Sequence, residues 1–191
     1  MAKILRNPLG SELIYLLKEG PKGRRTLTKQ VGASESSVRT VLEHLQSEGI
    51  VEMDRRGTSL SDMGRLAFGP LLESVLSVRE VDLPELSMGE ISRAALLDKV
   101  EEFSGSAWSL RDLAIREGAQ GAILLEIDEE MKFLNSDDLL EDINRDAFKA
   151  LKERFPNWKG SSLIVIVSGE SSEDVEHGLW RIIGEIVLKK C

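Results

Sequence analysis

Residues 26–64 constrain the fold more than any other segment, because their apolar spacing and turn residues agree with each other. Leu27 and Val31 lie four residues apart, as on one face of a helix. Gly32 and Ser34 follow, supplying a tight turn and the cap of a second helix. Over residues 35–48 the apolar side chains recur with a period near the 3.6 of a helix: Val38, Val41, Leu42 and Leu45. The segment therefore predicts a helix, a turn and a helix.

A strand hairpin is expected directly after the second helix. Gly49 ends that helix, residues 50–54 alternate as in a strand, and residues 55–58, Arg-Arg-Gly-Thr, form the tip. The whole pattern resembles the winged helix-turn-helix of transcription regulators, including Gly32 in the turn and Val38 as the buried anchor of the second helix. The resemblance implies a DNA-binding module. Thr28 departs from it, because such motifs usually keep alanine at this position.

The run from Gly23 to the hairpin also resembles the N-terminal DNA-binding part of bacterial sugar-responsive regulators that control central glycolytic genes. This resemblance covers about the first third of the chain. The charge agrees with it: residues 1–65 carry eleven Lys or Arg and eight Asp or Glu, a net charge of +3. Residues 66–191 carry 14 Lys or Arg and 25 Asp or Glu, a net charge of −11. The two parts add up to the net charge of −8 of the whole chain. An acidic partner region should be repelled by phosphate.

The expected DNA contacts lie on the approach to the second helix, on that helix and on the hairpin. They are Lys22, Arg24, Arg25, Glu35, Ser36, Arg39, Thr40, Glu43, Arg55, Arg56 and Thr58. Arg39 is the strong cation of the second helix, and its glutamates outnumber it. Two interpretations follow. Either Arg39 reaches a guanine while Glu35 or Glu43 accepts from a cytosine amino group, or the helix docks onto a protein and DNA binding is lost.

We expect an α+β fold of two domains joined by a helix. The proposed boundaries are a winged helix-turn-helix over residues 1–62, a linker or dimerisation helix over 63–80, and a dimerisation or effector-binding domain over 81–191. In the last region strand patterns at 93–100, 122–127, 131–134 and 162–167 alternate with helix patterns at 108–117 and 147–155, before a helix over 172–190. The order βαββαβ plus α is that of a ferredoxin-like domain with its helices on one face of the sheet.

Nothing in the sequence predicts an enzyme, a metal site or a cofactor. Phosphate-binding, zinc-protease and nucleophile-elbow motifs are missing, and the chain has two histidines and one cysteine. Two loops that precede helices could hold a small anion or polar effector, although ordinary helix capping explains them as well. Their candidate ligand residues, with a nearby countercharge, are Ser104, Ser106, Arg111, Ser168 and Ser171.

Residues 111–122 resemble a stretch of an uncharacterised archaeal family, in which a winged helix precedes an α/β domain of unknown function. That resemblance implies an architecture and an archaeal source, but no activity. No signal peptide or long apolar run is present, so a cytoplasmic protein without membrane contact is expected. The expected function is sequence-specific transcription regulation, with double-stranded DNA as partner, a homodimer as the assembly and a small-molecule effector as a candidate ligand.

Overall fold

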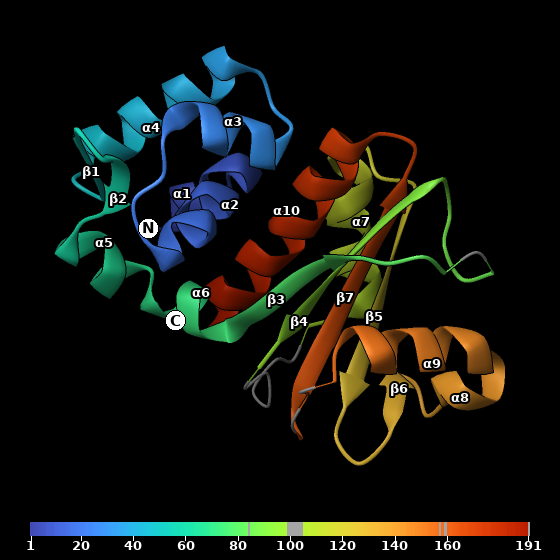
Figure 1. The fold of residues 1–191 in the computed structure, drawn as a ribbon. Helices are drawn as coiled ribbons and strands as arrows, with labels where there is room; N and C mark the ends of the chain where they lie inside the picture. The colour runs from blue at the N-terminus through green and yellow to red at the C-terminus, as the bar shows by residue number, and fades with distance from the viewer. Residues whose placement is uncertain (84, 99–104, 157, 159, 191) are drawn as a thin grey trace.

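The computed structural model describes residues 1–83, 85–98, 105–156, 158 and 160–190. They form a winged-helix region, residues 1–67, and a sheet region, residues 75–190, which lie side by side (Figure 1). A short helix joins them. Among the described residues, no helix has the length and apolar character needed to cross a membrane.

The helix-turn-helix consists of α3 (Arg24–Val31) and α4 (Glu35–Ser47). Gly32 ends α3 in the left-handed conformation, with φ of 67°, which glycine adopts without steric cost. The Ser34 hydroxyl accepts a hydrogen bond of 3.1 Å from the Ser37 N–H and so caps α4. Both helices pack on α2 (Pro8–Leu16), which follows α1 (Ala2–Leu5) and precedes the short 3-10 helix η1 (Leu17–Glu19). The predicted helix-turn-helix is therefore present.

The predicted hairpin is also present, and it gains a partner that the sequence did not indicate. Strands β1 (Val51–Asp54) and β2 (Gly57–Leu60) pair antiparallel, with Val51 opposite Leu60. Lys22 lies along the other edge of β2, and its main chain exchanges two hydrogen bonds of 2.9 Å with Thr58. A side chain at Gly57 would lie 2.6 Å from the Lys22 carbonyl oxygen, so this close approach requires glycine.

The helix expected over residues 63–80 is wrong in its second half. The structure has α5 (Asp62–Ala67), a break at Phe68, α6 (Gly69–Ser74) and then strand β3 (Val75–Glu80). The expected break at Gly69 and Pro70 is confirmed. Val75 and Val78 are three residues apart, which suits one face of a helix, but both are β-branched and β3 pairs antiparallel with the next strand.

The sheet region contains β4 (Ile91–Leu97), α7 (Ala107–Arg116), β5 (Gly121–Ile127), β6 (Met131–Phe133), α8 (Leu140–Ile143), α9 (Arg145–Arg154), β7 (Ser162–Gly169) and α10 (Ser172–Lys190). The strand order is β3-β4-β7-β5-β6, and all neighbours are antiparallel. Every residue of the central strand β7 is buried. The α+β class and the order βαββαβ plus α are thus confirmed. The last residues of the first expected strand, 99 and 100, lie outside the described residues.

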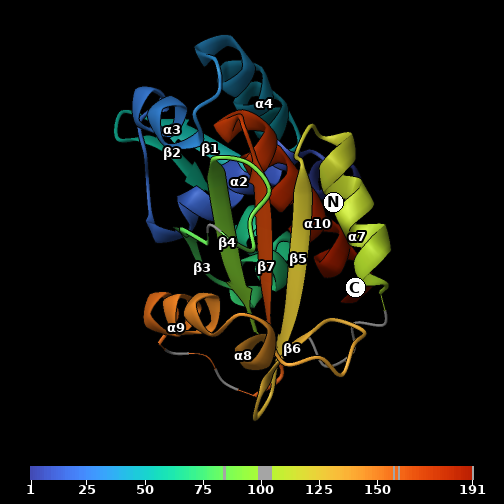
Figure 2. The ribbon, with the colours of Figure 1, turned by 90° about the vertical axis from the view of Figure 1, so that its right-hand side faces the viewer.

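Two features distinguish this sheet from the ferredoxin-like arrangement. The last strand, β7, lies between β4 and β5 rather than at an edge of the sheet. The helices cover both faces, because α7 and α10 pack on one side while α8 and α9 pack on the other (Figure 2). The expectation of helices on one face was wrong because β4, β5 and β7 carry apolar side chains on both sides, each of which needs cover.

Helix α10 lies between the winged-helix region and the sheet (Figure 1). It contacts α1 and α2 on one side and β4 and β7 on the other, so the two regions share one continuous apolar core. Gly184 allows the closest approach: a Cβ there would overlap the Leu5 carbonyl oxygen and lie 3.0 Å from its carbon. The winged-helix region is therefore fixed directly onto the last helix.

Candidate nucleic-acid interface

Helix α4 presents a polar face to solvent at one end of the molecule, opposite α8 and α9 (Figure 2). Val38 and Leu42 hold the other face in the core. The exposed side chains are the ones that the sequence predicted for DNA contact: Glu35, Ser36, Arg39, Thr40 and Glu43. The Thr40 hydroxyl donates to the Ser36 carbonyl oxygen at 2.9 Å. The face thus offers one guanidinium, two carboxylates and two hydroxyls.

Both arginines at this face are paired with glutamate. Arg24, at the start of α3, lies 3.3 Å from Glu35, measured from Nε to Oε1. Arg39 lies 3.7 Å from Glu43 one turn further along α4. Arg24 is 49% exposed, and the other three side chains are more than half exposed. Exposed pairs of this kind contribute only about 0.2–1 kcal/mol, so a phosphate or a base can replace either partner.

The wing carries one fixed and one free arginine. Arg56 is held by Asp54, which accepts from its main-chain N–H at 2.7 Å and from its guanidinium at 2.9 and 3.0 Å. The main-chain hydrogen bond, followed by the guanidinium, lowers the pKa of Asp54 below its usual value. Arg55 is exposed and makes no ion pair within the described part of the chain. Arg55 is therefore the wing cation available to a phosphate.

The remaining predicted DNA contacts differ in their availability. Arg25 is exposed and has no ion pair with any described residue. Lys22 is largely buried, and its ammonium lies 3.5 Å from a Glu19 carboxylate oxygen. Thr58 is 4% exposed, and its main chain pairs with Lys22. Lys22 and Thr58 thus build the wing, a role the sequence did not indicate because it depends on a pairing between distant residues.

The two candidate ligand loops lie apart. Ser106 precedes α7, whereas Ser168 lies beside Gln120, which follows α7. Ser168 belongs to the buried strand β7 and accepts a 3.0 Å hydrogen bond from the Ser92 hydroxyl. The Ser171 hydroxyl accepts from the Asp174 N–H at 3.4 Å, as an ordinary cap of α10 would.

Ser104 lies outside the described residues. Arg111 is 4.5 Å from the centre of the Trp108 ring and pairs with Asp112 at 3.5 Å. The structure therefore does not bring the four described candidates together in one site.

Comparisons with known proteins agree with this geometry. Residues 13–75 match the family model described as the CggR N-terminal DNA binding domain, and they include α3, α4 and the wing. Residues 88–186, more than half of the chain, match the model described as a domain of unknown function, DUF4443. The chain belongs to the DUF4443 family. No curated protein matches the chain.

Among the solved structures that share the fold of this DUF4443 protein is "Hypothetical protein PH0730" from Pyrococcus horikoshii OT3. Its TM-score is 0.70 at 20% identity, and the match covers 94% of this chain and 92% of that one. The two family matches confirm the expected combination of an N-terminal DNA-binding domain and a C-terminal domain of unknown function. The N-terminal match to a DNA-binding domain family suggests that the DUF4443 protein is a DNA-binding regulator.

Proposed function

We propose that this protein is a sequence-specific transcription regulator, whose helix α4 enters the major groove while the wing contacts the DNA backbone. The observation that carries the proposal is the exposure of Arg39 on α4, together with the exposed Arg25 on α3 and the exposed wing residue Arg55. In such modules the second helix of the motif contacts base edges, and flanking cations contact phosphates.

The charge distribution supports the same arrangement. The basic residues that flank α4 belong to a region of net charge +3, whereas the region beyond residue 65 has −11. Phosphate attracts the first and repels the second, so duplex DNA should approach with the winged-helix region foremost. Glu35 and Glu43 weaken the attraction at α4 itself and favour recognition of particular bases over tight nonspecific binding.

The test is selection of duplexes from genomic fragments, followed by affinity measurements by fluorescence anisotropy at several salt concentrations. We expect affinity to fall linearly on a logarithmic salt scale, and Arg25→Ala and Arg55→Ala each to reduce the slope by about 0.9. Arg145→Ala, an exposed charge change on α9, is the matched control and should leave the slope unchanged. Failure to retain any duplex at low salt would refute the proposal.

The alternative function is a protein-interaction module that reuses the winged helix. The observation in its favour is that Arg24 and Arg39 are already neutralised by Glu35 and Glu43. A stable protein partner whose binding survives both Arg39→Ala and Arg55→Ala, together with no DNA retention, would establish the alternative.

We further propose a homodimer that binds two half-sites. Leu66 on α5 is 84% exposed and Met63 is 51% exposed, and burying them against a second copy would remove apolar surface from water. To bind two half-sites, such a dimer must present its two α4 helices about 34 Å apart, which is one turn of DNA. Light scattering should give a dimer for the native protein and a monomer for Leu66→Asp, and a monomeric native protein would exclude this contact.

A further inference from the structure

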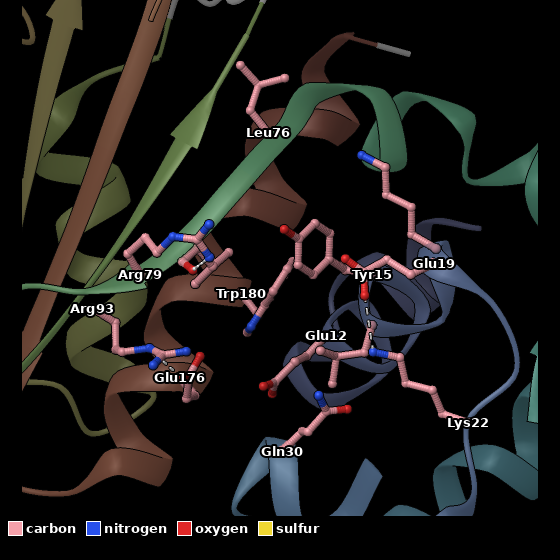
Figure 3. Close-up of a pocket in the computed structure, with 13 residues that line it drawn as sticks. Glu12, Tyr15, Glu19, Lys22, Gln30, Leu76, Arg79, Arg93, Glu176 and Trp180 are labelled. Atoms are coloured by element: carbon pink, nitrogen blue, oxygen red, sulfur yellow. Dashed lines mark hydrogen bonds and ion pairs between the residues drawn. The ribbon is translucent and has the colours of Figure 1, made fainter. Parts of the chain in front are cut away.

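A cavity of about 370 Å³ lies between the winged-helix region and the sheet region (Figure 3). Its walls come from α2, η1 and α3 on one side and from β3, β4 and α10 on the other. The volume lies within the range of pockets that bind small molecules. No local sequence motif predicts this cavity, because its residues come from segments far apart in the chain.

Two buried carboxyl groups from opposite walls face this cavity. Glu12 of α2 and Glu176 of α10 are each 5% exposed. Arg93 of β4 lies 2.7 Å from one oxygen of Glu176, measured from Nε to Oε1. The other oxygen, Oε2, is buried and accepts no hydrogen bond from any described residue. Trp180 Nε1 is also buried and makes no well-aligned hydrogen bond with a described residue, although its N–H lies close enough to Glu176 to act on that carboxyl.

Such unpaired buried groups are rare, because each loses its hydrogen bonds to water and gains none in return. Glu12 makes no ion pair with a described residue either. Its removal from water is the main cause that raises its pKa well above the usual value. The nearby Glu176 adds to this rise, and Arg93 opposes it. Burial likewise raises the pKa of Glu176, against the effects of Arg93 and then of the nearby Trp180 indole N–H. A bound cationic group would therefore stabilise the ionised form of both carboxyls.

The opposite requirement, for an anionic group, is set by Arg79 at the cavity mouth. Arg79 is exposed, lines the cavity and makes no ion pair with the residues that the structure describes. The two lysines that line the cavity already have partners, since Lys18 donates to the Leu72 carbonyl oxygen and Lys22 pairs with Glu19. The rings of Tyr15 and Trp180 pack with centroids 5.1 Å apart and give the cavity an apolar surface.

We propose that this cavity binds a small zwitterion with the layout of an α-amino acid. Glu12 and Glu176 receive its ammonium group, Arg79 receives its carboxylate, and Tyr15 lies against its apolar part. Because the walls belong to both regions, the bound molecule favours one placement of the winged helix against the sheet and so changes DNA affinity. That regulatory role rests on the proposed function, whereas binding itself does not.

The experiment measures binding of each of the twenty common amino acids to the full chain by calorimetry and thermal unfolding, without DNA. We expect at least one to bind saturably and to raise the melting temperature. Its N-acetyl and methyl ester derivatives, which lack one of the two charges, should bind at least about tenfold more weakly.

Two variants test the assigned contacts. Arg79→Ala changes an exposed side chain, so it should fold normally and weaken binding roughly tenfold or more. Glu12→Gln should weaken binding of the ammonium, and Arg145→Ala is the control that leaves binding unchanged. The proposal is overturned if no amino acid binds to the native protein at millimolar concentration. It is also overturned if the native protein binds the methyl ester as tightly as the free amino acid and the Arg79→Ala protein binds the free amino acid as tightly as the native protein does. DNA binding does not enter these measurements, so its failure would be seen separately.

Discussion

Replacing Gly184 by alanine tests whether α10 fixes the winged-helix region in place. The added Cβ would overlap the carbonyl oxygen of Leu5 and lie 3.0 Å from its carbon, so α10 and α1 would have to separate by about 1 Å to restore normal contact. Main-chain atoms form the obstacle, and no flexible side chain can yield. We take the upper end of the cost of overpacking, about 3 kcal/mol. Alanine returns about 1 kcal/mol through its higher helix propensity.

The net loss is about 2 kcal/mol, which for a chain of this size lowers the melting temperature by about 4–8 °C. Differential scanning calorimetry measures it, and hydrogen exchange should show faster exchange in α1 and α2. Gly69→Ala is the matched control, because nothing lies within 4 Å of its added Cβ, and it should be neutral or slightly stabilising. A Gly184→Ala protein that melts at or above the native temperature would refute the direct contact.

Three further substitutions test the buried polar groups and the polar face of α4. Burial raises the pKa of Glu12, so the stability that this carboxyl contributes is fully present below its pKa in the unfolded chain and is lost as the pH rises. Glu12→Gln should therefore raise the free energy of unfolding, measured by urea titration, at about pH 8 and much less at about pH 5. Equal effects at the two pH values would contradict a buried ionisable Glu12. Thr28→Val removes a buried hydroxyl that bonds to no described residue and should raise the free energy of unfolding by about 1 kcal/mol, whereas a loss would reveal a bonded hydroxyl. Glu43→Gln frees Arg39 and should strengthen DNA binding up to about fivefold by anisotropy, while weaker binding at one site alone would assign Glu43 to base recognition.

The sequence predicts the helix-turn-helix well because its signals are local. Gly32 and Ser34 act on their own backbone, and Val38 takes its place from the period of a single helix. The helix predicted through residue 80 was wrong because Val75 and Val78 suit either a helix or a strand. Only the neighbouring strand β4 decides between them, and no local pattern contains that information.

The site residues divide in the same way. Exposure of Arg39 and Arg55 follows from the periodicity of α4 and from the turn of the wing, which the sequence shows. The burial of Thr58 depends on Lys22, and the encounter of Glu12 with Glu176 depends on α2 meeting α10 across the core. These are pairings between segments far apart in the chain, and a single sequence does not specify which segments meet.

The position of α10 has a consequence for the synthesis of the protein. This helix follows every other described element in the chain, yet α1 and α2, the first two, pack against it. During translation the apolar surface that they present to α10 therefore has no partner until roughly 170 further residues have been added, about 9–35 s at ordinary elongation rates. In that interval the nascent winged helix exposes apolar side chains, which makes it prone to aggregation until α10 packs against it.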